Sequence, residues 1–195
     1  MDRLTQVAMS PESGEEAAKL GAQMMAFNYK PMEVQKEEYE QYKVKYVECH
    51  GRNPRPLLLT DMCICDSDAA RAKENSKYIA NYLLSVLHHY DLMGDHYKNA
   101  KGYEAYGDAV DALRETGKEG MMEAYVEGQI WGTPDQMLKK FEARKKEMGQ
   151  TDCLMAFRFA GIDYKTAQRS QKLFSEEVMP VLKSWEEDDA AEKAA

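Results

Sequence analysis

Residues 4–21, LTQVAMSPESGEEAAKLG, decide the fold, because they join an apolar stretch directly to a helical pattern. Leu4–Met9 is short and apolar, which predicts a strand. The apolar positions Ala17, Ala18 and Leu20 have the spacing of one helix face. Strand, turn and helix together form one unit of an α/β fold.

The boundary between this strand and this helix carries helix-capping residues. Ser10 suits the N-cap, Pro11 the first helical position, and Glu12 the positive end of the helix dipole. Gly21 suits the C-terminal stop. The sequence therefore predicts a helix that begins at Pro11 and ends before Gly21.

The strand–helix pattern recurs along the chain. Residues 24–27 form a second apolar run, followed by a polar, tyrosine-rich helical pattern over 31–50. A third strand is predicted over 57–65, and one long helix over 68–92.

The sharpest local signal is GTPDQ at 132–136. Thr133 suits an N-cap, and the glutamine three residues later suits a capping box. The helix that starts there precedes a fourth predicted strand over 153–159, and a last helix is predicted over 164–185.

Alternating strands and helices indicate a parallel sheet of about four βα units. A complete eight-stranded barrel needs about 250 residues, so this chain of 195 is short for one, while a small doubly wound sheet would fit. We predict one domain over 1–185, with a glycine-broken excursion over 94–128 that carries a short helix near 106–114. An acidic, disordered tail is predicted over 186–195.

Composition narrows the classes of partner. With 44% hydrophobic and 31% charged residues the chain can bury one substantial core. A net charge of -8 and a pI near 5.1 argue against nucleic acid as a partner. Mean hydropathy is -0.68, and neither a membrane span nor a secretory signal is recognisable, so we expect a soluble, cytoplasmic protein.

Two groups of residues contain the types that bind metals, but neither has the spacing of a site. Cys63 and Cys65 lack a second close pair, and on a strand both thiols would point the same way. Neighbouring histidines on a helix point about 100° apart, which disfavours the second group. That group comprises His88, His89, Asp91 and His96. We predict reduced thiols and no metal.

Four segments stand in a recognisable order along the chain. They are VAMSPES running into AAKLG over 7–21, Lys101-Gly102-Tyr103, WGTPDQ over 131–136, and LFSEEVMP over 173–180. Their order and spacing resemble the C-terminal half of the bacterial-luciferase-like flavin-dependent monooxygenases. The resemblance implies a partial TIM (β/α) barrel that holds roughly strands five to eight of the family fold.

The same resemblance implies a function. The family uses reduced FMN, or in some branches a deazaflavin, with dioxygen to oxygenate a small organic substrate. Because the missing half carries much of the flavin pocket and the luciferases' catalytic histidine, no catalytic residue is assigned here. The chain is expected to be a truncated or split form, completed by a homo-oligomer or by a separate N-terminal half. The alternative is a noncatalytic half-barrel assembly module that binds flavin weakly or not at all.

Three residues of the first turn, Met9, Ser10 and Ser13, resemble the family segment that holds the flavin phosphate. Free N–H groups and hydroxyls at a helix start attract an anion, although Glu12 opposes it. The alternative interpretation is that Ser-Pro-Glu is simply a helix cap.

Three further residues are candidates for the active-site mouth or lid. Arg158 lies at the end of the last predicted strand, where a charge faces a barrel mouth or makes a salt bridge to a helix. Lys101 and Tyr103 begin the excursion that resembles the mobile region over the flavin. The alternative is that this excursion is an ordinary surface connection.

Overall fold

The computed structural model of the chain describes residues 3–91, 94 and 117–185. Lys101, Tyr103, the helix expected near 106–114 and the tail over 186–195 lie outside the described residues. Among the described helices, none is long and apolar enough to cross a membrane.

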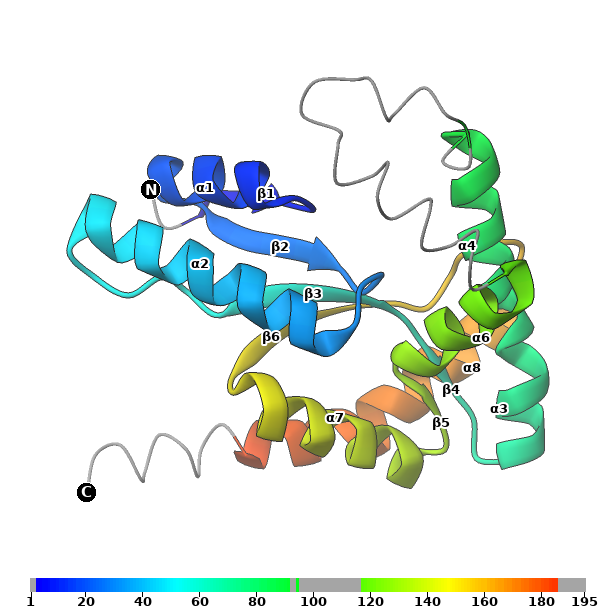
Figure 1. Ribbon diagram of the computed structural model, residues 1–195. Coiled ribbons are helices and arrows are strands. Elements are labelled where there is room, and N and C mark those ends of the chain that lie inside the picture. Colours follow the sequence, from blue (N-terminus) through cyan, green and yellow to red (C-terminus); the bar gives the residue numbers. More distant parts are fainter. Residues whose placement is uncertain (1–2, 92–93, 95–116, 186–195) are drawn as a thin grey trace.

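Four parallel strands form the central sheet (Figure 1). They are β1 (Thr5–Val7), β2 (Gln23–Phe27), β3 (Leu57–Met62) and β6 (Thr151–Ala156), and they lie side by side in that order. Along the chain, each strand of this sheet is added at the same side of the one before it, as in a barrel. In a doubly wound sheet the strands stay parallel, but the later ones are added at the opposite side of the first. The predicted parallel α/β sheet is confirmed.

The first unit folds as predicted. Helix α1 (Pro11–Leu20) has Ser10 as its N-cap and Gly21 as its C-cap. Gly21 has φ of 68°, a left-handed conformation that glycine adopts without strain. Helix α2 (Met32–His50) likewise ends at Gly51, at φ of 64°.

The third predicted strand divides in two. At Cys63, whose N–H donates to the carbonyl of Ala156, the chain leaves the main sheet. It continues as β4 (Ile64–Cys65), which pairs with β5 (Trp131–Gly132) in a second small sheet. The prediction of one strand over 57–65 is therefore corrected at this residue.

The predicted long helix over 68–92 is also two helices, α3 (Ala69–Asn75) and α4 (Lys77–His89). They meet at Ser76, whose hydroxyl donates to the carbonyl of Lys73 at 2.8 Å. A serine that bonds locally to the backbone competes with the helical ladder, which explains the break.

The described end of the excursion over 94–128 contains α6 (Lys118–Gly128), a helix that its irregular apolar spacing did not predict. Helix α7 (Pro134–Met148) follows, with the predicted capping box at Thr133. Strand β6 begins and ends earlier than the predicted 153–159, because its pairing with β3 runs from Thr151, opposite Leu57, to Ala156, opposite Met62.

The final predicted helix is present, with a local change of winding. Helix α8 (Tyr164–Leu173) continues through η2 (Phe174–Val178), one turn of π-helix, and residues to 185 remain helical. Phe174 and Val178 are buried against α7 in this region.

The main core lies on one face of the sheet, where α1 and α2 pack beside β2 and β3 (Figure 1). Its members are Ala8, Ala17, Ala18, Met24, Ala26, Tyr39, Tyr42, Tyr46, Leu57, Leu59 and Met148. Because side chains alternate along a strand, the residues between them point to the opposite face. They include the apolar Val7, Met25, Phe27, Leu58 and Leu154 and the polar Gln23, Thr60 and Asp152.

A buried ion pair joins β3 to α7. Asp61 and Arg144 are 0% and 1% exposed. Two guanidinium N–H groups of Arg144 donate to the two carboxylate oxygens of Asp61, each at 2.7 Å. The Asn28 side chain donates to Asp61 at 2.9 Å and to the carbonyl of Gly128 at 2.7 Å. The network therefore ties the sheet to both α6 and α7.

Arg144→Met should lower the free energy of unfolding by about 3–5 kcal/mol, because it leaves a buried carboxylate without its counter-charge. Lys146→Met, an exposed change on the same helix, should cost less than about 0.5 kcal/mol. Urea denaturation of both variants measures the difference, and equal losses would contradict the assignment. The double variant Asp61→Leu with Arg144→Met should lose less stability than Arg144→Met alone.

Candidate functional site

The carboxyl ends of β1 and β2 lie at one edge of the sheet, because the strands are parallel and adjacent. Met9 and Ser10 follow β1, and Asn28, Tyr29 and Lys30 follow β2. In barrels built of parallel strands this edge carries the ligand-binding loops. The predicted residues Met9, Ser10 and Ser13 all lie at this edge.

At the start of α1 the serine hydroxyls are engaged with each other and with the backbone. The Ser10 N–H donates to Ser13 Oγ at 3.0 Å, and the Ser13 N–H donates to Ser10 Oγ at 3.3 Å. The Ser13 hydroxyl also donates to the Ser10 carbonyl at 2.9 Å. The turn is therefore a complete capping box, as the helix-cap alternative expects.

Glu12 adds a negative charge to the same turn. Its own backbone N–H, and then the hydroxyl of Ser10, hold the pKa of its carboxyl below the usual value. Pro11 has no N–H to offer. An anionic ligand at this helix start therefore competes with Glu12 for the backbone donors.

Lys30, which follows β2, places a positive charge beside the turn after β1. It was not among the predicted residues. Its ammonium donates to the carbonyl of Met9 at 2.8 Å and pairs with Glu38 at 2.5 Å. The Phe27 N–H donates to the sulfur of Met9 at 3.3 Å, so the turns after β1 and β2 are held together. A search for a cation just after the second strand could have found Lys30.

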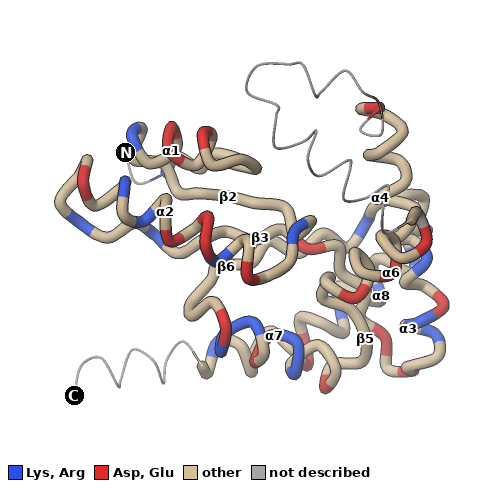
Figure 2. Tube along the Cα trace, in the orientation of Figure 1, with Lys and Arg blue, Asp and Glu red and all other residues tan. Residues whose placement is uncertain are grey.

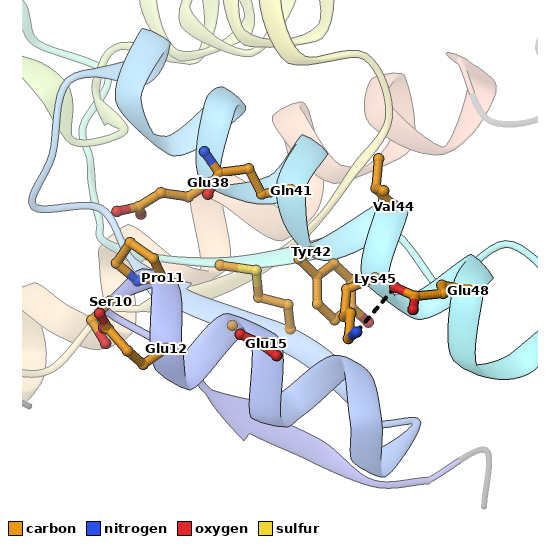
Figure 3. Close-up of a pocket in the computed structure, with 12 residues that line it drawn as sticks. Ser10, Pro11, Glu12, Glu15, Glu38, Gln41, Tyr42, Val44, Lys45 and Glu48 are labelled. Carbon is orange, nitrogen blue, oxygen red and sulfur yellow. Dashed lines mark hydrogen bonds and ion pairs between the residues drawn. The ribbon is translucent and has the colours of Figure 1, made fainter.

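A hollow of about 440 Å³ lies beside this turn, between α1 and α2 (Figure 3). Met24 and Tyr42 contribute to its lining, and Lys45 pairs with Glu48 at its rim at 3.0 Å. Figure 2 shows acidic positions along α1 and α2. Carboxylates around the hollow come from both helices. They are Glu12, Glu15, Glu38 and Glu48. Their charge disfavours an anion inside the hollow itself.

An aromatic cluster covers the ends of β2, β3 and β6. The ring of Tyr29 stacks on that of Tyr125 from α6, with centroids 5.2 Å apart. Tyr82 of α4 makes an edge contact with Phe159, which follows β6. Burial, and then the hydroxyl of Tyr82, raises the pKa of Tyr29, so its phenol stays protonated. These contacts join both side helices to the strand ends.

Asp66, just after β4, is a buried carboxylate that was not among the predicted site residues. It is 2% exposed and accepts from the Arg71 guanidinium, including Nε at 3.0 Å. This bond holds the pKa of the Asp66 carboxyl below its usual value. Arg169 of α8 lies 3.5 Å away, so Asp66 anchors α3 and α8 to the strand end.

Arg158 lies two residues beyond β6, in the loop that follows the strand and not at the end of the strand as predicted. Its side chain is exposed, and its guanidinium lies over the ring of Tyr164 at 5.8 Å from the centroid. It therefore contacts the start of α8. Lys101 and Tyr103 cannot be placed beside it, since they lie outside the described residues.

The cysteines of the described region are free thiols. Cys63 and Cys65 are buried in the same cluster, so their side chains do point the same way, and burial raises the pKa of Cys65 to about 12. Within 3–91, 94 and 117–185, no three His, Cys, Asp or Glu side chains are grouped as a metal site requires.

The turns after β1 and β2 contain the types of hydrogen-bond donor that bind the phosphate of a flavin. Two hydroxyls, the amides of a helix start and the ammonium of Lys30 are the donors that such a group needs. Binding there requires the carboxylate of Glu12 to turn away.

Lys30→Met should lower the free energy of unfolding by about 1.5–3 kcal/mol, because it leaves the half-buried Glu38 and the Met9 carbonyl without their donor. Lys172→Met removes an exposed 3.8 Å pair with Glu176 and should cost under about 0.5 kcal/mol. Thermal unfolding of the two variants at neutral pH measures the difference. A loss for Lys30→Met no larger than that of Lys172→Met would show that Lys30 does not join the two turns.

Solved structures similar to this chain are luciferase-like barrels. A monooxygenase from Streptomyces bottropensis matches with a TM-score of 0.62 and 16% identity, over 90% of this chain and 47% of that one. The oxygenating constituent of 3,6-diketocamphane monooxygenase from Pseudomonas putida, solved with FMN, gives the same values. The coenzyme F420 dependent tetrahydromethanopterin reductase from Methanopyrus kandleri matches with a TM-score of 0.56 and 18% identity, over 89% and 49% of the two chains.

At these identities the likeness shows the fold alone, which is part of a TIM (β/α) barrel. The chain spans about half the length of these solved structures. No curated protein sequence matches it. The model of the luciferase-like monooxygenase family matches residues 4–152, which is most of the chain. The chain therefore belongs to the luciferase-like monooxygenase family.

Proposed function

We propose that this chain forms part of a flavin-dependent monooxygenase, an oxidoreductase that uses reduced flavin and dioxygen on a small organic substrate. The family match over 4–152 is the observation that carries the proposal. The turns after β1 and β2 support it, because they bring hydroxyls and an ammonium to the ligand-binding edge. The chain then acts as a truncated or split form, within a barrel that further strands complete.

The cofactor we propose is FMN or a deazaflavin, with its phosphate at Met9, Ser10 and Ser13. Two similar structures support this class, since one was solved with FMN and another is named for coenzyme F420. Lys30 lies within reach of the Met9 carbonyl and adds the positive charge that a phosphate requires. When bound, the reduced flavin supplies the electrons that activate dioxygen.

The residues of this chain contribute binding and shielding. The protonated phenols of Tyr29 and Tyr125, held by burial, cover the strand ends and exclude water from that edge. Arg158, Lys101 and Tyr103 remain our candidates for the mouth or lid. We also propose a cytoplasmic location, since the cysteines of the described region are free.

The second candidate function is a noncatalytic assembly module with weak or absent flavin binding. The capping box favours it, because Ser10 and Ser13 already satisfy each other and Glu12 occupies the backbone donor. In that case the first turn serves only to start α1.

Titration with FMN and with riboflavin, which lacks the phosphate, separates the two functions. Ser13→Ala and Ser10→Ala should weaken FMN binding about tenfold to a hundredfold, the effect of losing one hydrogen bond to a charged group. Riboflavin binding should change less. Glu12→Gln should strengthen FMN binding relative to riboflavin, because it removes the competing charge.

Ser85→Ala is the matched control, since the hydroxyl of this exposed serine on α4 donates to the Asn81 carbonyl of its own helix, far from the first turn. It should leave both affinities unchanged. Equal losses for FMN and riboflavin in the Ser10 and Ser13 variants would make the turn a helix cap only. No measurable binding of either ligand by the unaltered chain would favour the assembly module.

A further inference from the structure

Both outer strands of the central sheet have one free edge within the described residues. Strand β1 pairs only with β2, and β6 pairs only with β3. An open strand edge presents N–H and C=O groups that another strand can pair with. The sheet is therefore able to accept a further parallel strand at either side.

The face of the sheet opposite the main core is partly open. It carries apolar side chains, and near the amino ends of the strands it also carries Gln23, which donates to the Asp152 carboxylate at 2.6 Å. Val7 on β1 is 46% exposed and Leu154 on β6 is 43% exposed, and the register places both on this face. Between them lie Met25 and Leu58, which are half-buried. The buried hydroxyl of Thr60, also on this face, has no hydrogen-bond partner within the described part of the chain.

We propose that a second copy of this chain covers this face and closes an eight-stranded barrel. In that dimer β6 of each copy lies beside β1 of the other. The proposal rests on the proposed function, because it names the partner that completes the same ligand-binding edge.

The direction of the strands limits the symmetry of such a dimer. All four strands run the same way, and barrel strands must pair in parallel. Rotation about a twofold axis along the strands preserves their direction, whereas an axis across the strands reverses it. The axis must therefore run along the barrel, and both seams become identical β6–β1 pairs.

The chain itself supplies matching surfaces for both seams. Each edge strand presents one exposed apolar side chain to the open face, Val7 at one side and Leu154 at the other. Two copies also provide twice the four strands, and one chain spans about half of the similar barrels. Closure would cover the open face and gather two sets of strand ends at one mouth.

Cys153 offers a direct test, because it is an exposed thiol on β6. The register places it on the helix-facing side of the sheet, the same side as Gln6 of β1. Within one chain these two strands are three strand spacings apart, about 14 Å, beyond the reach of a disulfide. A bond between the two positions must therefore join two copies.

The experiment uses the full chain with Gln6→Cys and Cys49→Ser, the second change removing the exposed cysteine of α2. Mild oxidation, or a short thiol cross-linker, should give a covalent species of twice 22.3 kDa and nothing larger. In the closed barrel both outer strands of each copy are paired, so no strand edge is left for a third copy. A ladder of trimers and longer species would therefore overturn the proposal. A monomer by light scattering with no cross-link would overturn it as well.

The matched control adds Cys153→Ser to the same chain, and it should abolish the cross-link. Cross-linking that persists would mean that two β1 edges pair with each other, which contradicts the parallel seam. Cys153→Ser keeps an acceptor near Arg144, whose Nη1 lies 3.9 Å from the Cys153 sulfur. Thermal unfolding of the control checks that the ion pair of Asp61 and Arg144 is retained.

A second set of variants tests the open face without cysteines. Val7→Lys and Leu154→Lys should each weaken the dimer at least about tenfold in sedimentation analysis, because each places a charge in a closing barrel. Val44→Lys is the control, since Val44 is 71% exposed on α2 and lies outside the seams. Equal effects of all three changes would contradict the proposal.

Flavin titration of the same samples separates this inference from the proposed function. If the protein is a monomer that binds FMN, the proposed dimer is wrong and the proposed flavin site stands. If the protein forms the predicted cross-linked dimer but binds neither FMN nor riboflavin, the proposed dimer stands and the proposed flavin-dependent function is wrong.

Discussion

The pairing of Asp61 with Arg144 is the interaction on which the rest of the structure depends. It brings a carboxylate from the middle strands and a guanidinium from α7 into full burial, at two bonds of 2.7 Å. Neither charge is tolerated there alone. Because Asn28 joins the pair and also bonds to the end of α6, the position of one charge fixes several elements. The turn after β2 is among them, so the ligand-binding edge inherits its geometry from this pair.

Local patterns predicted most of the fold because most of its boundaries are made locally. The caps at Ser10 and Thr133, and the left-handed glycines after α1 and α2, depend on neighbouring residues and could be read from sequence. The division at Cys63 could not be read, since it depends on where β6 and β5 end up in three dimensions. The position of β6 at the outer side of the sheet could not be predicted for the same reason.

The candidate site likewise has features that the sequence could predict and features that depend on three-dimensional contacts. Ser10 and Ser13 could be singled out from the turn, but whether their hydroxyls are free is a matter of geometry, and here they bond to each other. Lys30 joins the site through contacts with Met9 and Glu38, one of which spans 21 positions of the chain. The stacking of Tyr29 on Tyr125 links still more distant segments, so no periodicity could have indicated it. Function at this edge is therefore a property of assembled turns.

The distance along the chain between Asp61 and Arg144, 83 positions, also orders the folding process. The units of β1, β2 and β3 make contacts between near neighbours, and such contacts form with little loop-closure entropy. Asp61 meets Arg144 only when α7 docks, after a long closure. Until then Asp61 lacks its counter-charge, and burying it in an apolar core would cost free energy. The ion pair thus makes the stability of the early part of the chain depend on the late part, because a strand residue and a helix residue 83 positions apart must be buried together.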